Sequence, residues 1–362
     1  MGFRTADFPS SLHRPGRPDR LMRFLSVGLN GLMFAEKFAH LPPVPSVDHV
    51  DFHEVTVIGR EIVALDENVV ALTFAGTEPL GRWSAGAHLD VKLPSGAVRQ
   101  YSLCGDASDH STYRIAVRLI PDGRGGSAEV HSLAVGDRIE VSKPRNAFPL
   151  ALGGYNQAHP AVRFIAGGIG ITPILPMLAA ADKLGVEWTM IYAGRSRESL
   201  AFLDELAPYG DRITLHVDDE QGLAGAEELL GPLVPGAAVY TCGPAPMLDS
   251  LSAALAEHPT VEFHFERFSE APVVDGKPFE LRLARTGERI TVDADTTALT
   301  ALLEKRPDAT YSCRQGFCRS CAVRVLDGAP EHRSAALSKA EEEEGYFLPC
   351  VSRAEGTLTL DL

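Results

Sequence analysis

Four of the six cysteines in this 362-residue chain have a spacing that could bind iron. Cys313, Cys318 and Cys321 share one loop in the pattern C-x4-C-x2-C, and Cys350 follows after a long gap. Four thiolates with this plant-type spacing hold two irons. Gly316 gives the loop the backbone freedom to curl round such a cluster, so that its amides can point at the sulfur atoms. The spacing therefore predicts a [2Fe–2S] cluster.

Zinc and disulfides are the competing interpretations of these cysteines. Structural zinc sites usually pair two C-x2-C knuckles or include histidine, so one C-x4-C-x2-C loop with a single remote cysteine fits zinc poorly. A disulfide framework is expected in secreted proteins. The segment from Met1 to Pro18 is polar and proline-rich and lacks the apolar stretch of a signal peptide. We therefore expect a cytoplasmic, thiol-reducing location and metal-bound thiolates.

A second set of residues could bind a flavin. A flavin needs an aromatic ring against its face, a hydroxyl or amide near N5 and a cation for its phosphate. Arg99, Tyr101 and Ser102 lie at the end of an expected strand and can supply all three. Strand alternation places Arg99 and Tyr101 on one side and Ser102 on the other. Surface strands often carry Arg and Tyr, so this string alone is a weak signal.

The glycine-rich segment 123–127 could cradle the phosphate of that flavin. Gly125 and Gly126 expose backbone amides, Arg124 adds a positive charge, and Ser127 can open the following helix. A plain glycine-rich turn is the alternative interpretation.

A third set of residues indicates a nicotinamide coenzyme. A short buried strand leads into Gly167, Gly168 and Gly170, whose missing side chains permit close approach of a pyrophosphate. Thr172 can cap the next helix, and Pro173 suits its first turn. Any doubly wound domain could carry such a turn.

Two further segments of the same region bear on the coenzyme. Cys242, Gly243 and Pro244 close a later strand at the carboxyl edge of the expected sheet, where ligands bind. A buried structural cysteine is the alternative for Cys242. Arg195 follows the second strand, near the expected adenosine ribose, and could pair with the 2′-phosphate of NADPH. No acidic residue decides between the coenzymes, and we expect NADH.

The elements that must position these motifs fall into three domains. From 51 to 150, short β-branched runs between Gly, Pro and Asp turns predict an antiparallel β-barrel for the flavin. From 151 to 269, strands alternate with helices, which predicts an α/β doubly wound domain for NAD(P)H. A polar linker over 270–277 leads to a small α+β ferredoxin-like domain over 278–362. A bound cluster would stabilise so small a domain by cross-linking its loops.

Local patterns predict several elements within these domains. Helices are expected over Pro173–Leu184 and Ala298–Lys305. Phe279–Leu283 and Arg289–Val292 flank a Thr-Gly turn and are predicted to form a hairpin.

The N-terminal extension, 1–50, and the overall charge restrict the partners. Leu21–Ala35 is apolar but shorter than a membrane span, so we expect an amphipathic helix packed on the protein, with contact at a membrane surface as the alternative. The formal net charge of −14 argues against nucleic-acid binding and suits docking on a basic partner. We expect a monomer.

The cluster loop and its flanks resemble a known family. The C-terminal domain is similar to the ferredoxin domain of the phthalate dioxygenase reductase and vanillate demethylase reductase family. Glu331-His-Arg-Ser334 and Cys350-Val-Ser-Arg353 match segments of that family. One departure is Arg319, where the family usually has glycine; we expect its guanidinium near the cluster edge.

The resemblance extends over about residues 51 to 362 and implies cofactors and roles. Family members carry R-x-Y-S-L followed by G-R-G-G-S and bind FMN, which favours FMN over the FAD of ferredoxin–NADP reductases. In the related superfamily the Cys-Gly-Pro segment lies beside the nicotinamide, which implies that Cys242 helps to place the ring and need not be a nucleophile. A phenylalanine at the end of this domain approaches the flavin, a role carried to Phe268.

The combination implies an NAD(P)H-dependent reductase. Electrons pass from NAD(P)H through the flavin and the cluster to a terminal oxygenase, with a Rieske non-haem iron enzyme as the usual acceptor. A haem-thiolate or membrane di-iron monooxygenase is the alternative acceptor. The rival function is an electron relay or sensor that does not itself oxidise NAD(P)H.

Overall fold

The computed structural model describes residues 51–66, 68–121, 125–151, 161–269, 272–307, 309–311, 313–316, 319–334 and 336–362. Near the N-terminus it also gives the backbone of two antiparallel strands, β1 (Ser10–Ser11) and β2 (Arg14–Pro18), within a unit formed by residues 1–48. Residues 49–362 form a second unit, which carries every predicted site. The helix predicted over Leu21–Ala35 lies outside the described residues.

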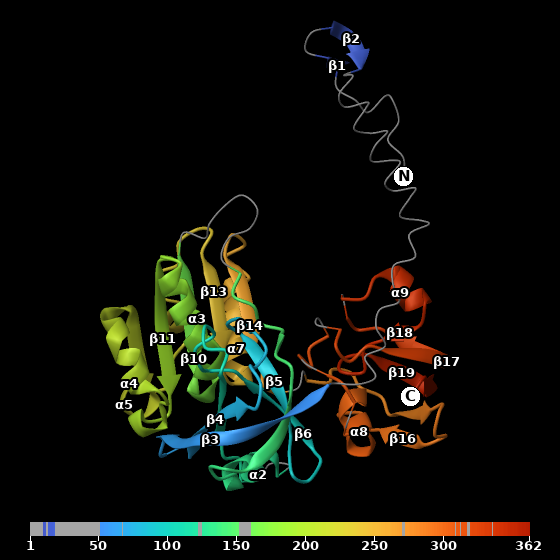
Figure 1. Ribbon diagram of the computed structural model, residues 1–362. Coiled ribbons are helices and arrows are strands. Elements are labelled where there is room, and N and C mark those ends of the chain that lie inside the picture. The colour runs from blue at the N-terminus through green and yellow to red at the C-terminus, as the bar shows by residue number, and fades with distance from the viewer. Residues whose placement is uncertain are drawn as a thin grey trace. The chain divides into compact units, whose positions relative to one another are not determined.

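The first part of the second unit is an antiparallel β-barrel (Figure 1). Its strands follow the order β6-β5-β8-β3-β4-β7, and a bridge between Leu103 and Ile115 joins the two ends of the sheet. Buried aliphatic and aromatic side chains fill the interior. Its elements are β3 (Phe52–Ala64), β4 (Val69–Gly76), β5 (Ala87–Lys92), β6 (Val98–Ser102), β7 (Thr112–Arg118), α2 (Gly126–Ser132), β8 (Arg138–Ser142) and β9 (Arg145–Asn146).

A parallel five-stranded sheet follows, in the order β12-β11-β10-β13-β14. Its strands are β10 (Val162–Gly167), β11 (Trp188–Gly194), β12 (Ile213–Val217), β13 (Ala238–Cys242) and β14 (Glu262–Glu266). The connecting α-helices are α3 (Ile171–Lys183), α4 (Leu203–Leu206), α5 (Asp218–Gln221), α6 (Ala226–Leu230) and α7 (Ala245–Leu255). Short 3-10 turns, among them η2 (Gly168–Gly170), complete the connections.

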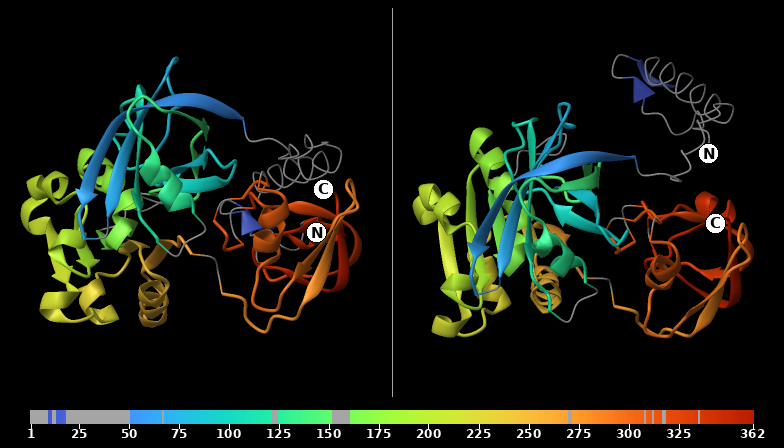
Figure 2. Two further views of the ribbon diagram at one scale, coloured as in Figure 1. Left: turned by 90° about the horizontal axis from the view of Figure 1, so that it is seen from below. Right: turned by 60° about the horizontal axis from the view of Figure 1, so that its bottom comes forward.

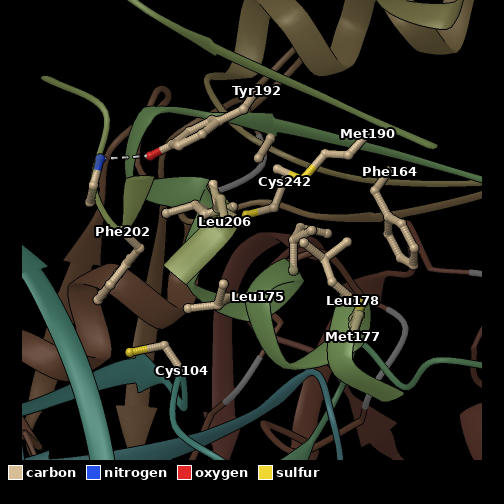
Figure 3. Packing of buried hydrophobic residues seen from close by; sticks show 14 of the residues in the cluster. Cys104, Phe164, Leu175, Met177, Leu178, Met190, Tyr192, Phe202, Leu206 and Cys242 are labelled. Carbon is tan, nitrogen blue, oxygen red and sulfur yellow. Dashed lines mark hydrogen bonds between the residues drawn. The ribbon is translucent and has the colours of Figure 1, made fainter. Parts of the chain in front are cut away.

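Side-chain alternation along the strands builds a core on each face of this sheet. Phe164 and Ala166 pack with Ile174 and Leu178 of α3, whereas Ile165 faces the side covered by α6 and α7. Figure 3 shows the first of these cores, in which residues of the sheet, α3 and α4 meet.

The C-terminal domain, orange to red in Figure 2, is an α+β unit. Its sheet has the order β16-β15-β19-β17-β18. Its elements are β15 (Phe279–Leu283), β16 (Arg289–Val292), α8 (Ala298–Lys305), β17 (Val323–Glu331), α9 (Lys339–Glu343), β18 (Tyr346–Phe347) and β19 (Arg353–Leu360). The antiparallel barrel, the doubly wound sheet and this domain confirm the predicted fold class. Among the described residues, no helix combines the length and apolar character that crossing a membrane requires.

Two arginines fasten the interdomain linker to the C-terminal domain. Arg353 is 2% exposed, and its guanidinium donates at 2.8 Å to the carbonyls of Lys277, Asp293 and Thr296. Arg333 donates to the carbonyls of Val274 and Asp275. Because each guanidinium bonds to two or more main-chain carbonyls, the two side chains hold the end of the linker against the C-terminal domain.

Candidate functional site

The cluster loop lies over a small apolar core of its own. Cys321 and Cys350 are 4% and 1% exposed within this core. The amide of Gln315 lies 3.4 Å from the sulfur of the half-buried Cys313, as expected for a main-chain donor to a thiolate. Gly316 has φ +80°, and a Cβ there would come within 2.7 Å of Val351, next to Cys350. The loop therefore needs glycine to approach the segment of the remote cysteine.

Cys318, the remaining predicted ligand, lies outside the described residues. Within the described residues, no three His, Cys, Asp or Glu side chains are grouped closely enough to hold a metal ion. The buried thiols, the amide donor to sulfur and the glycine contact fit thiolate ligation of an iron–sulfur cluster.

Arg319 has a backbone conformation that glycine adopts more easily than other residues. Its φ is +64°, in the left-handed region that favours glycine. Its side chain is 40% exposed and pairs with Glu341, which also forms the capping box of α9 with Ser338. The guanidinium is thus engaged by a carboxylate, so its charge is compensated locally.

The predicted flavin residues meet between strand β6 and the start of α2. A Cβ on Gly126 would lie 2.7 Å from Nε of Arg99, so the arginine packs directly over this glycine. Gly125 has φ +78° and open space where a side chain would be. Ser127 does not cap the helix; its hydroxyl instead accepts from the amide of Ile120 at 3.0 Å. Arg124 lies outside the described residues.

Ser102 joins the barrel to the parallel sheet. Its hydroxyl donates to Oε2 of Glu266 at 3.2 Å, across 164 residues of sequence. Glu266 is paired in register with Cys242 at the carboxyl edge of the sheet. Ser102, Cys242 and Glu266 therefore lie together where the two domains meet.

Glu266 is a site residue that the sequence did not single out. Burial raises the pKa of its carboxyl to about 7, although the hydrogen bond from Ser102 opposes the shift. Burial, together with this neighbouring carboxylate, also raises the pKa of the Cys242 thiol well above its usual range. Cys242 is consequently a poor nucleophile, as the resemblance implies. A glutamate at the carboxyl end of a strand of the parallel sheet, where ligands bind, is the signal that could have identified Glu266.

The glycines of the predicted nucleotide loop allow two turns to touch. A Cβ on Gly170 would lie 2.1 Å from the carbonyl oxygen of Cys242, and one on Gly167 would lie 2.7 Å from Pro244. A Cβ on Gly243 would likewise lie 3.2 Å from Cα of Gly167. By contrast, Gly168 has φ +52° and open space beside it, as a cradle for an incoming phosphate would need.

Other predicted residues of this domain have different surroundings. Thr172 does not cap α3; its hydroxyl donates to the carbonyl of Ile169 at 3.0 Å, and Gly170 occupies the cap position. Pro173 lies in the first turn, where its missing amide costs nothing. Arg195 is exposed beyond β11. Phe268 follows β14 and is 48% exposed. Its ring is therefore accessible to a ligand.

Cys242 projects into the core between the sheet and α3 (Figure 3). Its side chain is fully buried, so the part of this turn that remains available to a coenzyme is the partly exposed Gly243 and the exposed Pro244.

Comparison with known proteins places these features in context. The model of the 2Fe-2S iron-sulfur cluster binding domain matches residues 281–355, which contain the four predicted cysteine ligands. The chain is 42% identical to a putative toluene-4-sulfonate monooxygenase system reductase subunit of Comamonas testosteroni, over 85% of this chain and 98% of that protein. It is 37% identical to a vanillate O-demethylase oxidoreductase of a Pseudomonas species, over 85% and 99%.

Two solved structures are similar along the same stretch. Phthalate dioxygenase reductase, described as a modular structure for electron transfer from pyridine nucleotides to [2Fe-2S], superposes with a TM-score of 0.64 and 31% identity, over 86% of this chain and 98% of that chain. A type IV self-sufficient cytochrome P450 monooxygenase gives a TM-score of 0.66 and 38% identity. That match includes 86% of the present chain but only 41% of the cytochrome P450 chain.

A β-barrel, a doubly wound domain and a [2Fe–2S] domain in one chain define an NAD(P)H-dependent oxidoreductase that serves an oxygenase system. The chain belongs to the phthalate dioxygenase reductase and vanillate O-demethylase reductase family.

Proposed function

We propose that this protein passes electrons from NADH through FMN to a [2Fe–2S] cluster and on to a Rieske-type terminal oxygenase. The observation that carries the proposal is the Ser102–Glu266 hydrogen bond, which joins the predicted flavin strand to the carboxyl edge of the predicted nicotinamide domain. In this assignment the flavin barrel comprises residues 51–150, the NADH domain 151–269 and the cluster domain 278–362.

The residues of the chain have distinct tasks in this proposal. Arg99, Gly125 and Gly126 hold the flavin phosphate, while Tyr101 packs against the ring. Ser102 and Glu266 carry the polar groups at the meeting point of flavin and nicotinamide. When bound, the flavin accepts a hydride and releases single electrons, which is the chemistry that the cofactor rather than the protein supplies. Cys313, Cys318, Cys321 and Cys350 hold the cluster.

The released flavin is expected to be FMN. Arg99 packs over Gly126, beside the positive-φ Gly125, so the site ends in a compact cradle suited to a terminal phosphate. Chromatography of the cofactor released by heat identifies it directly. Recovery of FAD would contradict this assignment and would imply that the cradle holds a pyrophosphate.

Anaerobic addition of NADH is expected to bleach both the flavin and the cluster of the purified protein without any added enzyme. An electron relay or sensor would need an external reductase, so absence of bleaching would refute the reductase assignment. Iron and acid-labile sulfide analysis on the same sample separates the cluster from zinc, because a zinc site contains no labile sulfide.

For the acceptor, a haem-thiolate monooxygenase is the second candidate, because the chain matches part of a self-sufficient cytochrome P450. Reconstitution with each class of purified oxygenase distinguishes the two.

A further inference from the structure

A main-chain carbonyl of the cluster domain is held by two side chains of the barrel. The carbonyl oxygen of Tyr311 accepts from Nε2 of Gln100 at 2.6 Å and from Nη2 of Arg145 at 3.1 Å. Gln100 lies in β6 and Arg145 in β9, so residues far apart in the sequence converge on one peptide group.

Asp90 orients the two barrel side chains, Gln100 and Arg145, that make this contact. The side chain of Asp90 is 4% exposed, and its two oxygens accept from Gln100 at 3.0 Å and from Arg145 at 2.5 Å. The Asp90 amide in turn donates to Ser142 at 2.9 Å. A buried carboxylate with two partners orients both donors, so the socket, defined as Asp90, Gln100 and Arg145, is preorganised.

The cluster side is equally constrained. Tyr311 is 3% exposed and packs in the same apolar core as Cys321 and Cys350. The guanidinium of Arg314 lies 4.3 Å from the centre of its ring. Tyr311 is two residues before the predicted ligand Cys313, so the peptide held by the barrel adjoins the cluster loop.

Strand β6 connects the socket to the predicted flavin site. Alternation along the strand puts Arg99 and Tyr101 on one side and Gln100 on the other. The carbonyl of Val98, at the start of the same strand, receives the Tyr311 hydroxyl at 3.5 Å. One short strand thus carries Arg99 and Tyr101 of the predicted flavin site on one side and Gln100, which contacts the Tyr311 carbonyl, on the other.

We propose that Asp90, Gln100 and Arg145 form a docking socket for the Tyr311 peptide that sets the separation between flavin and cluster. Gln100 and Arg145 are positioning residues, because they touch the loop and not the reacting groups. The inference rests on the proposed function, since it concerns electron transfer between the two cofactors.

The first test is Gln100→Met, which keeps the volume of the side chain but removes both of its donor contacts. Stopped-flow mixing with NADH under anaerobic conditions should show flavin reduction at the original rate. Transfer from flavin to cluster should slow about tenfold, because small misplacements of reacting partners are costly. The matched control is Gln221→Met, which removes a hydrogen bond from Val217 within the nucleotide domain.

A readout independent of electron transfer is hydrogen–deuterium exchange of the intact protein. Peptides covering 96–104 and 309–316 should exchange faster in Gln100→Met than in the parent, and should be unchanged in Gln221→Met. The electron paramagnetic resonance spectrum of the reduced cluster should be the same in all three proteins, which shows that the cluster itself is intact.

A second variant, at Arg145, tests the same contact in case Gln100→Met does not fold. Arg145→Lys retains the charge beside Asp90 but loses the planar group that reaches both Asp90 and Tyr311. Its matched control in the barrel is Arg138→Lys, whose arginine pairs only with the exposed Glu54 in the described structure. Arg145→Lys should slow flavin-to-cluster transfer and speed exchange, whereas Arg138→Lys should do neither.

Unchanged transfer and unchanged exchange in both Gln100→Met and Arg145→Lys would overturn the socket. Failure of the proposed function is recognised separately, because the parent protein would then fail to bleach with NADH. Even in that case the exchange experiment still reports whether the socket holds the loop.

Discussion

Replacement of Cys350 with serine is expected to abolish electron delivery to cytochrome c while leaving NADH-driven flavin reduction intact. Cys350 is 1% exposed in the core under the cluster loop. Loss of one thiolate from a four-thiolate site removes a direct ligand. Mutation of a residue that only hydrogen-bonds to a metal ligand costs about 10- to 100-fold in metal affinity or activity. Loss of a ligand itself should therefore lower the rate of cytochrome c reduction about 100-fold or more.

Cys104→Ser is the matched control for this experiment. Cys104 is also 1% exposed, but it lies in the barrel, and its thiol contacts the carbonyl of Arg114 at 3.5 Å. Its variant should retain iron, sulfide and cytochrome c reduction. Equal rates in the parent and in folded Cys350→Ser would show that electrons bypass the cluster.

The second prediction concerns the pH dependence of flavin reduction. The Glu266 carboxyl has a pKa raised to about 7 by burial, so it ionises between pH 6 and pH 8. Positive charge develops on a nicotinamide as it loses hydride, and a nearby carboxylate stabilises that charge in a poorly solvated site. The rate constant should therefore rise about tenfold over this range. In Glu266→Gln it should stay low and independent of pH.

A stability measurement checks the same ionisation without any coenzyme. The pKa is higher in the folded state than its ordinary value of 4.5, so the folded state retains a proton that the unfolded state has lost. The resulting stability is complete below pH 4.5 and is lost as the pH rises through about 7. The free energy of unfolding should fall by about 3 kcal/mol relative to Glu266→Gln across that window. A constant difference between the two proteins would exclude Glu266 as the titrating group.

Local patterns predicted the elements whose own residues decide their structure. β15, β16 and α8 have the bounds that the sequence indicated, because the buried Phe279, Leu281 and Leu283 alternate with less buried residues and Thr297 caps the helix. Helix α7 was not predicted, since the two prolines at its start suggest a turn. Proline is tolerated in the first turn of a helix, and Leu248, Leu251 and Leu255 carry the spacing of a buried face.

The polar contacts at the site could not be predicted in the same way. Ser102 was selected for the flavin, but its partner Glu266 comes from another domain, and no local periodicity encodes how the barrel meets the sheet. The same holds for the Tyr311 carbonyl, whose donors lie more than 160 residues earlier in the chain. The cap expected from Thr172 was wrong, because its hydroxyl donates to the nearby carbonyl of Ile169 instead.

The attachment of the linker by Arg333 and Arg353 has a kinetic consequence for the two cofactor domains. β14 ends at Glu266, and the first linker carbonyl held by these arginines is that of Val274. The intervening chain, residues 267–273, spans at most about 25 Å even when fully extended. A tether of this length corresponds to an effective concentration in the millimolar range. We therefore expect the cluster domain to need only a weak intrinsic affinity for the barrel to remain docked, and to return rapidly to the barrel after any separation.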